Sequence, residues 1–426
     1  GRRTNSSIVS VFNGEISIDN TYLDWASFYQ TINICNTILK FAPTAQANDP
    51  TFSEAQLKEY EGQAIAIRSL MYFYLVRTFG DVPFIREAYV NGSQQMSVAK
   101  SSEKEILAGL VADLEMVETG NYLPGQYSST DIAQNKGRMT MWAVKALLAD
   151  IYLWQEEYEK CNRKCDEIIG SGQLLLVPVE SRKIEVENTE EGTTDIYYAP
   201  DQSSYYSLFQ QIYYQGNSME SIFELQFATD NLNPFYSLMS SGRGVIGVKT
   251  ERVNSDIFPP LADEAYSGEC FDIRSVISQS KSCLWKYIGV EPNGSERAQE
   301  EYTNNFIIYR LAEIYLMKAE ALNSIDDTSN DKYDALNEVR GRAGLTSITA
   351  ADNLNKEQFA EVVLEERLHE LCCEHLRRWD LIRFGKLGEY MKDHAGVTIQ
   401  PYHVLYPIPQ AAVDANDAIT ENNEGY

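Results

Sequence analysis

The sequence predicts a mainly α-helical protein, built as an array of helical hairpins with an irregular region in the middle. Apolar residues recur at helical spacing over residues 22–172 and again over residues 306–390. Residues 173–305 lose this spacing and contain many turn residues and short strand-like pieces. Successive helix–turn–helix pairs are typical of a tetratricopeptide-like array, although no strict repeat of about 34 residues is present. Residues 391–426 are predicted to be coil.

The first helical region contains five predicted helices. Residues 25–39 place Phe28, Ile32, Cys35 and Leu39 on one stripe, which predicts a helix with one buried face. A second helix begins at Ser53, becomes apolar on every side over residues 64–76, and ends where Gly80 and Pro83 cannot continue it. A third begins at residues 102–103, with its stripe at Ile106, Leu110, Leu114 and Val117. Residues 139–154 and 158–169 complete a further pair.

The irregular region, residues 173–305, is predicted to hold only short strands. Residues 222–227 alternate with period two, and residues 283–288 are a second candidate. A loop-rich insertion of this length in a helical protein usually carries function or forms a subdomain.

The second helical region is predicted to begin at Ile308. Its first stripe comprises Ile308, Leu311, Ala312, Tyr315, Ala319 and Leu322. Helices over residues 333–342 and 356–375 follow, with a break near Trp379.

Composition excludes several classes of protein. The 36 basic and 62 acidic residues give a net charge of −26, which disfavours nucleic acid and anionic lipid as partners. The seven cysteines lack the density of a disulfide scaffold and the spacing of a zinc finger. No apolar run approaches the roughly 20 residues of a membrane span.

Candidate catalytic groups favour a structural role. His369-Glu370 resembles the opening of a zincin helix, but the second histidine would have to stand at 373, where the chain has Cys. The carboxylates of Glu366, Glu370 and Glu374 are interspersed with arginines, which would keep them ionised and remove general-acid ability. We therefore expect an ion-pair lattice with Glu374–Arg378 and Arg367–Glu370 pairs and no metal or cofactor. The expected structural residues are Glu366, Arg367, Glu370, Arg378 and Asp380.

Aromatic residues are abundant in the predicted loops. A sugar ring requires a flat aromatic surface together with planar carboxylate, amide or guanidinium partners. Tyr22 and Trp25 stand beside Asp19, Asn20 and Asp24, directly before the first long helix. This combination makes the segment a candidate sugar-binding surface.

Six segments, in order, resemble the SusD/RagB family, whose members are nutrient-binding lipoproteins of the Bacteroidetes outer membrane. The matching segments are residues 63–84, 137–153, 310–322, 336–345, 365–384 and 405–426. The tail Thr420-Glu-Asn-Asn-Glu-Gly-Tyr426 departs slightly, because the family more often has Gln and Pro there.

The resemblance implies a single SusD-like domain over residues 1–426, with the family's N-terminal segment and its lipid anchor apparently missing. It also implies binding without catalysis, at the extracellular face of the outer membrane, and delivery of ligand to a SusC-like TonB-dependent barrel. The helical side would contact the barrel, and loops would contact the ligand. The expected ligand-binding residues are Asp19, Asn20, Tyr22, Asp24, Trp25, Arg243, Tyr266, Trp285 and Tyr287.

Three functions stay open at this point. An oligosaccharide ligand is favoured, and peptide capture is a second possibility within the same family. A glycoside hydrolase on a helical frame is the alternative from another class, and it would need two carboxylates about 5 to 9.5 Å apart across a cleft.

Overall fold

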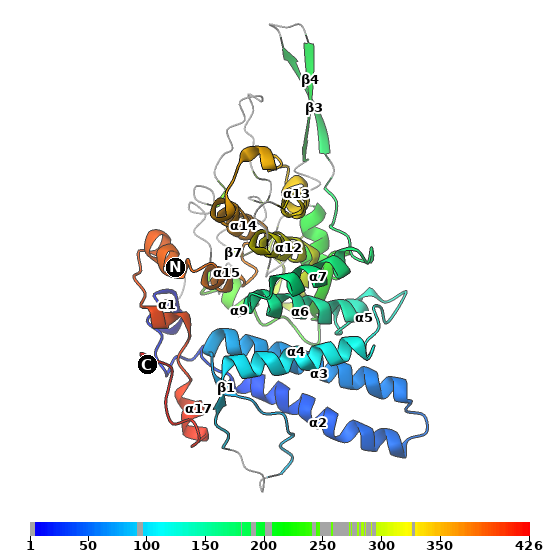
Figure 1. The fold of residues 1–426 in the computed structure, drawn as a ribbon, viewed down its shortest axis with the longest axis vertical. Coiled ribbons are helices and arrows are strands. Elements are labelled where there is room, and N and C mark those ends of the chain that lie inside the picture. The colour runs from blue at the N-terminus through cyan, green and yellow to red at the C-terminus, as the bar shows by residue number, and fades with distance from the viewer. Residues whose placement is uncertain are drawn as a thin grey trace. The chain divides into compact units, whose positions relative to one another are not determined.

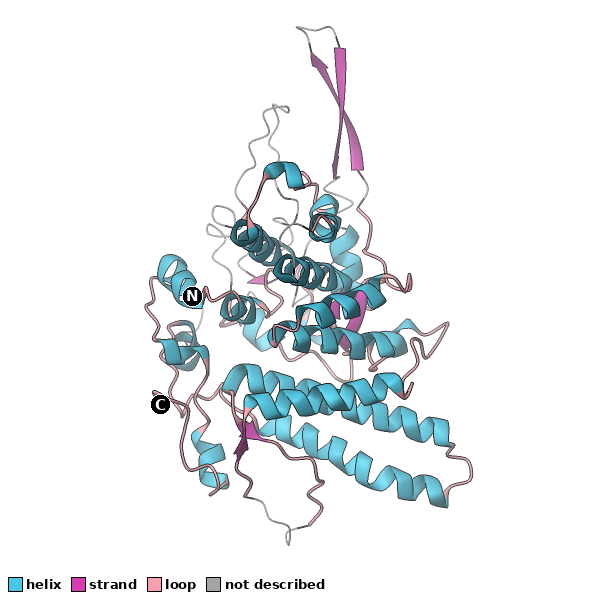
Figure 2. Cartoon of the chain, in the orientation of Figure 1, coloured by secondary structure: helices cyan, strands magenta, loops and turns pink. Residues whose placement is uncertain are grey.

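The computed structural model describes residues 5–91, 97–179, 181–188, 193–200, 207–240, 244–247, 257–258, 272, 274, 279–280, 283–284, 286, 291, 295–325 and 329–426. The chain forms two compact units. We call residues 4–129, 138–155 and 378–426 the terminal unit, and residues 1–3, 130–137 and 156–377 the central unit. Helices dominate both units, so the predicted mainly helical fold class is confirmed (Figures 1 and 2).

Four long helices form the body of the terminal unit. They pack in succession, α2 against α3, α3 against α4, and α4 against α6. They are α2 (Ala26–Asn48), α3 (Glu54–Phe79), α4 (Glu103–Thr119) and α6 (Met141–Trp154), with the short α1 (Ser6–Phe12) before them. Among the described helices, none combines the length and apolar character that crossing a membrane requires.

Helix α3 has the boundaries that its sequence predicts. Ser53 and Gln56 form a reciprocal capping box at its start. Gly80 ends it with a φ of 70°, a conformation that glycine adopts without strain. The strand β1 (Val82–Pro83) follows and pairs with β2 (Lys100–Ser101).

A buried polar cluster joins three helices of the terminal unit. Arg68 of α3 donates to Asn36 of α2 and to Asp113 of α4, both at 2.8 Å. Arg86 also donates to Asp113 at 2.5 Å. Charged groups this well paired fix the register of the three helices.

The C-terminal segment is more ordered than the predicted coil. It contains α16 (Leu387–Tyr390), the π-helical turn η6 (Met391–Ala395), the 3-10 helix η7 (Pro401–Val404) and α17 (Gln410–Ala415). The Tyr406 N–H donates to the Thr78 carbonyl at 2.8 Å, and Asn423 Nδ2 donates to the Phe79 carbonyl at 2.8 Å. The segment is therefore fastened to the end of α3.

In the central unit, α12 (Leu311–Ile325) contacts three other helices. These are α7 (Tyr158–Ile169), α13 (Asp331–Arg342) and α14 (Lys356–Glu370). Shorter helical elements are α5 (Ile132–Lys136), η1 (Gln210–Gln215), α9 (Tyr236–Met239), η4 (Gln299–Glu301) and η5 (Ala350–Asp352).

Strands of the central unit form three antiparallel pairs. They are β3 (Ser181–Asn188) with β4 (Thr193–Pro200), β5 (Ser221–Leu225) with β8 (Phe306–Arg310), and β6 (Gln279–Ser280) with β7 (Cys283–Leu284). The long β3–β4 hairpin was not predicted, although the four residues that join its strands in the sequence include Gly192, which is typical of a hairpin connection.

Three predictions for the central unit are wrong in detail. The segment at Ile308 is strand β8, because it pairs with β5 before α12 begins. The expected stripe of α12 is wrong because this helix is buried on almost every side: Leu316 and Met317 are buried, whereas Tyr315 is only half-buried. The predicted alternation in β5 also fails, since its first four residues are all buried.

The predicted helix over residues 356–375 ends early, at Glu370. Cys373 and His375 adopt left-handed φ values of 65° and 61°, which a helix cannot contain. Trp379 lies inside α15 (Arg377–Arg383) instead of at the break. The expected ridge of three glutamates therefore ends at Glu370.

A buried ion network holds the strands and helices of the central unit together. Arg310 is 1% exposed and donates to Glu220, Glu370 and Glu374 at 2.6–2.9 Å. The network comprises the bases Arg274, Lys286, Arg310, Arg340 and Arg342 and the acids Glu220, Asp272, Glu366, Glu370 and Glu374.

The partners in this region differ from the expected helix-spaced pairs. Glu374 binds Arg310 and Lys286, whereas Arg378 donates to the carbonyls of His403 and Val404. Glu370 likewise binds Arg310, and Arg367 lies 3.6 Å from Glu313. Asp380 accepts from Arg383 at 3.0 Å. The ion-pair prediction thus named suitable residue types but the wrong pairs.

We expect the central unit to lose stability in acid. Burial opposes ionisation of Glu374, but the charges of Arg310 and Lys286 outweigh it and lower the pKa of Glu374 from 4.5 to about 2. This group therefore stabilises the fold fully above pH 4.5, and its contribution disappears as the pH falls toward 2. A shift of that size corresponds to about 3 kcal/mol.

Denaturant unfolding between pH 6 and pH 3 measures this loss, with Glu374→Gln as the control. The variant should be less stable at pH 6 and should show a shallower pH slope. Identical slopes in the two proteins would contradict the assignment.

Candidate ligand-binding pocket

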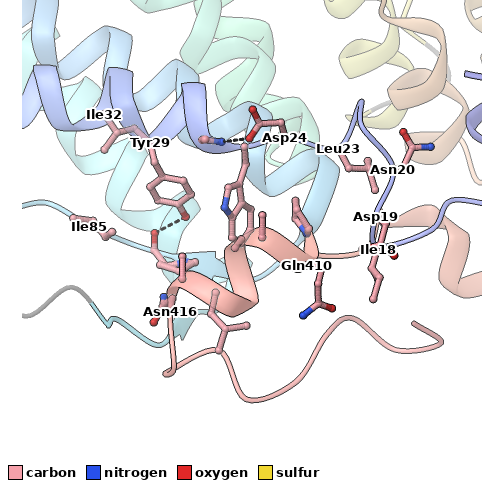
Figure 3. Close-up of a pocket in the computed structure, with 18 of the residues that line it drawn as sticks. Ile18, Asp19, Asn20, Leu23, Asp24, Tyr29, Ile32, Ile85, Gln410 and Asn416 are labelled. Carbon is pink, nitrogen blue, oxygen red and sulfur yellow. Dashed lines mark hydrogen bonds between the residues drawn. The ribbon is translucent and has the colours of Figure 1, made fainter. Parts of the chain in front are cut away.

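A pocket of about 560 Å³ opens on the terminal unit, within the size range of small-ligand sites. All its lining residues belong to that unit. They come from the loop before α2, the first turns of α2, the segment after β1, and α17 with its flanks (Figure 3). The lining residues are Ile18, Asp19, Asn20, Thr21, Leu23, Asp24, Trp25, Ala26, Tyr29, Ile32, Asn33, Pro83, Ile85, Tyr89, Pro409, Gln410, Ala411, Ala412, Ala415, Asn416 and Ile419.

Asn20 and Asp24 fix the shape of the loop before α2. The buried Asn20 amide donates to the Ser7 carbonyl and to Ser10 Oγ, both at 2.9 Å, and its oxygen accepts from the Tyr22 N–H. Asp24 Oδ1 accepts from the Ala26 N–H at 2.7 Å, at the start of α2. A carboxylate is favourable there because the helix N-terminus carries partial positive charge.

Trp25 contributes mainly to the core. Its side chain is buried, and the residue is 7% exposed. The ring makes edge-to-face contacts with Tyr29 and Phe79, each with centroids 5.4 Å apart. It therefore borders the pocket without offering an open ring face.

Tyr22 points to a different environment. It is 45% exposed, its hydroxyl accepts from Asn5 Nδ2 at 3.1 Å, and it is not among the lining residues. Of the five residues expected in this loop, the pocket includes Asp19, Asn20, Asp24 and Trp25. Arg243, Tyr266, Trp285 and Tyr287, also expected to bind ligand, lie outside the described residues.

The pocket lining also includes two tyrosines that the sequence analysis did not select. The Tyr29 hydroxyl donates to the Pro83 carbonyl at 2.9 Å (Figure 3), and burial raises the Tyr29 pKa well above its usual value. Asn33 exchanges two hydrogen bonds with the Tyr89 backbone, at 2.7 and 3.2 Å. Tyr89 is half-buried, so it is better placed than Trp25 to offer a ring to a ligand.

Helix α17 closes the third side of the pocket. The Gln410 N–H donates to the Ile18 carbonyl at 3.1 Å, and Asn416 Nδ2 donates to the Val98 carbonyl at 2.8 Å. Gln410 and Asn416 were also missed, because a six-residue helix after two prolines gives little periodic signal.

The pocket carries few groups that ionise. Its lining contains the two exposed carboxylates of Asp19 and Asp24 and no histidine, cysteine or serine. Among the residues that the structure describes, no group of three or more metal-ligating side chains could hold a metal ion.

Fold and pocket together define a class: a tetratricopeptide-like helical protein with a ligand-sized cavity beside its first long helix. Two family models match the chain. One, described as the SusD family, matches residues 278–426, and the other, described as starch-binding and associating with the outer membrane, matches residues 2–153. The chain belongs to the SusD/RagB family.

Individual relatives agree with this placement. The SusD-like protein P25 of Formosa agariphila is 26% identical over 99% of this chain and 82% of its own length. A SusD-like protein of Bacteroides fragilis has a TM-score of 0.72 and 20% identity, covering 98% of this chain and 89% of that one. Surface glycan-binding protein A of Bacteroides thetaiotaomicron, solved in complex with laminarihexaose, has a TM-score of 0.70 and 23% identity over 97% and 88% of the two chains. The resemblance and the predicted fold class are therefore confirmed.

Proposed function

We propose that the protein binds an oligosaccharide in this pocket, without cleaving it, and delivers it to a SusC-like TonB-dependent barrel in the outer membrane. Family membership supports the proposal, together with the family-model description as starch-binding and outer-membrane-associating. Fold neighbours described as a laminarin-binding SusD-like protein and as a glycan-binding protein with laminarihexaose support the ligand class. Lipid anchoring at the extracellular face and docking of the barrel on the helical side belong to the same proposal.

One observation carries the ligand assignment: aromatic and planar polar groups line the same cavity. A sugar ring presents C–H groups on its faces and hydroxyls at its edge. Tyr89 adds a half-buried ring to the lining. Asp19 and Asp24 add exposed carboxylates (Figure 3). Hydroxyl groups can donate to those carboxylates while a ring face covers the apolar wall.

We expect Ala415→Trp to weaken glycan binding at least tenfold, because a large side chain at this exposed lining position fills the mouth of the pocket. Tenfold is about 1.4 kcal/mol of binding free energy. Calorimetry against laminarihexaose, maltohexaose, cellohexaose and xylohexaose measures the change. Ala47→Trp is the matched control, since Ala47 is exposed on α2 and does not line the pocket.

The control should bind as the wild type does, and neither protein should release reducing sugar. Equal affinity of Ala415→Trp and wild type would place the glycan elsewhere. Release of reducing sugar by the purified protein would favour a hydrolase instead.

A further inference from the structure

We propose that this pocket accepts glycans without anionic groups and rejects those that carry carboxylate or sulfate groups. The inference rests on the proposed function and specifies the class of glycan. It follows from the charges that line the cavity and from the partners of its hydrogen-bond donors.

The cavity has exposed negative charge without a compensating cation. Asp19 and Asp24 are both exposed lining residues, and within the described part of the chain neither forms an ion pair with lysine or arginine. The lining itself contains no lysine, arginine or histidine.

The basic residue next to the lining in sequence has a partner outside the pocket. Arg86 follows the wall residue Ile85, and its guanidinium is paired with Asp113 at 2.5 Å. Arg86 itself is not among the lining residues.

The amide groups of the lining also hold the pocket together, each through at least one of its two N–H bonds. Each of the four side-chain amides donates to a protein acceptor. The pairs are Asn20 with Ser7 and Ser10, Asn33 with Tyr89, Gln410 with Asp414, and Asn416 with Val98, at 2.7–3.2 Å.

One N–H group at the helix end that could attract an anion is also occupied. A helix N-terminus is a ready anion-binding site when its N–H groups are free. At the start of α2 the Ala26 N–H donates to the Asp24 carboxylate, so the protein supplies its own anion there.

The lining therefore carries two carboxylates and no basic side chain. A neutral glycan brings hydroxyl donors that match the carboxylates, whereas an anionic glycan brings more acceptors and like charge. The net charge of −26 adds a field of the same sign at longer range. At low salt this should disfavour an anionic ligand by roughly tenfold or more, and salt should narrow the difference.

Calorimetry on the full chain compares the best-bound neutral hexasaccharide of the panel above with its sulfated derivative, at 50 mM and 500 mM NaCl. We expect the wild type to prefer the neutral form by at least tenfold at low salt and by less at high salt. Asp19→Asn with Asp24→Asn should reduce the preference about fivefold, because the two like charges that disfavour the sulfated form are removed. Asparagine at 24 keeps an oxygen for the Ala26 N–H.

Asp49→Asn, a matched control, removes one charge at an exposed position outside the pocket and should leave the preference unchanged. Equal or tighter binding of the sulfated form by wild type, blocked by Ala415→Trp, would overturn the inference while the proposed function stands. A preference that Asp49→Asn reduces as much as the double variant would also overturn it. Failure of every neutral and sulfated glycan to bind would overturn the proposed function itself.

Discussion

Arg310→Met should remove about 3–5 kcal/mol from the stability of the central unit, the cost measured when one partner of a buried ion pair is deleted. Among the residues that the structure describes, Arg310 is the only base of this network that pairs with three glutamates. They are Glu220, Glu370 and Glu374, all within 2.9 Å. Methionine fills similar space but leaves these carboxylates short of positive charge in a buried setting. Hydrogen exchange of α12 and α14 measures the loss locally, which suits a chain with two compact units.

Arg340→Met is the matched control for this prediction. Arg340 belongs to the same network, but its side chain is 18% exposed and its Glu366 partner keeps a second bond to Arg274. We expect a loss of about 1 kcal/mol or less, the range of a partly exposed pair.

The pH dependence of the Arg310→Met destabilisation should show whether it comes from lost charge or from lost packing. If uncompensated Glu374 causes the destabilisation of Arg310→Met, lowering the pH toward 4 protonates that carboxyl and reduces the penalty. A penalty that stays constant with pH, or one equal to that of Arg340→Met, would assign the effect to packing.

Trp25→Ala should destabilise the terminal unit by about 3–5 kcal/mol, the usual range for deleting a large buried aromatic ring. Trp25 is 7% exposed and packs edge-to-face against Tyr29 and Phe79, which places it between α2 and the end of α3. Any loss of glycan binding in this variant would follow from that structural damage. Denaturant unfolding and hydrogen exchange at the end of α3 measure the effect.

Tyr89→Ala should have the opposite effects to Trp25→Ala on stability and on glycan binding. Tyr89 is half-buried on the pocket wall, so removal of its ring should change stability little and weaken glycan binding about fivefold, the equivalent of about 1 kcal/mol for an aromatic contact. The two roles would be reversed if the Trp25→Ala protein stayed stable but no longer bound glycan, while the Tyr89→Ala protein still bound it. Trp25 would then contact the ligand, and Tyr89 would not.

Features set by neighbouring residues were predictable from the sequence. The capping box of Ser53 and Gln56, the end of α3 at Gly80, and the buried stripe from Ile106 to Val117 all depend on local spacing. The loop before α2 was selected because carboxylates and aromatics stand together there, and four of its five selected residues line the pocket. Their role in ligand binding stays a prediction.

Features decided by distant partners were not predictable. Ile308 has helical spacing with the residues after it, yet pairing of β8 with β5 makes it a strand. Glu374 stands four residues from Arg378, but the left-handed turn at Cys373 directs it to Arg310 and Lys286. Tyr89 gave no signal of its own, since Asn33 positions its backbone from 56 residues away.

The hydrogen bond from Gln410 to Ile18 joins nearly opposite ends of the sequence. The early loop therefore forms only part of the cavity wall, and α17 supplies the part that completes it. A chain that stops before α17 lacks this wall, so ligand recognition would depend on a segment far along the sequence from the loop that it completes.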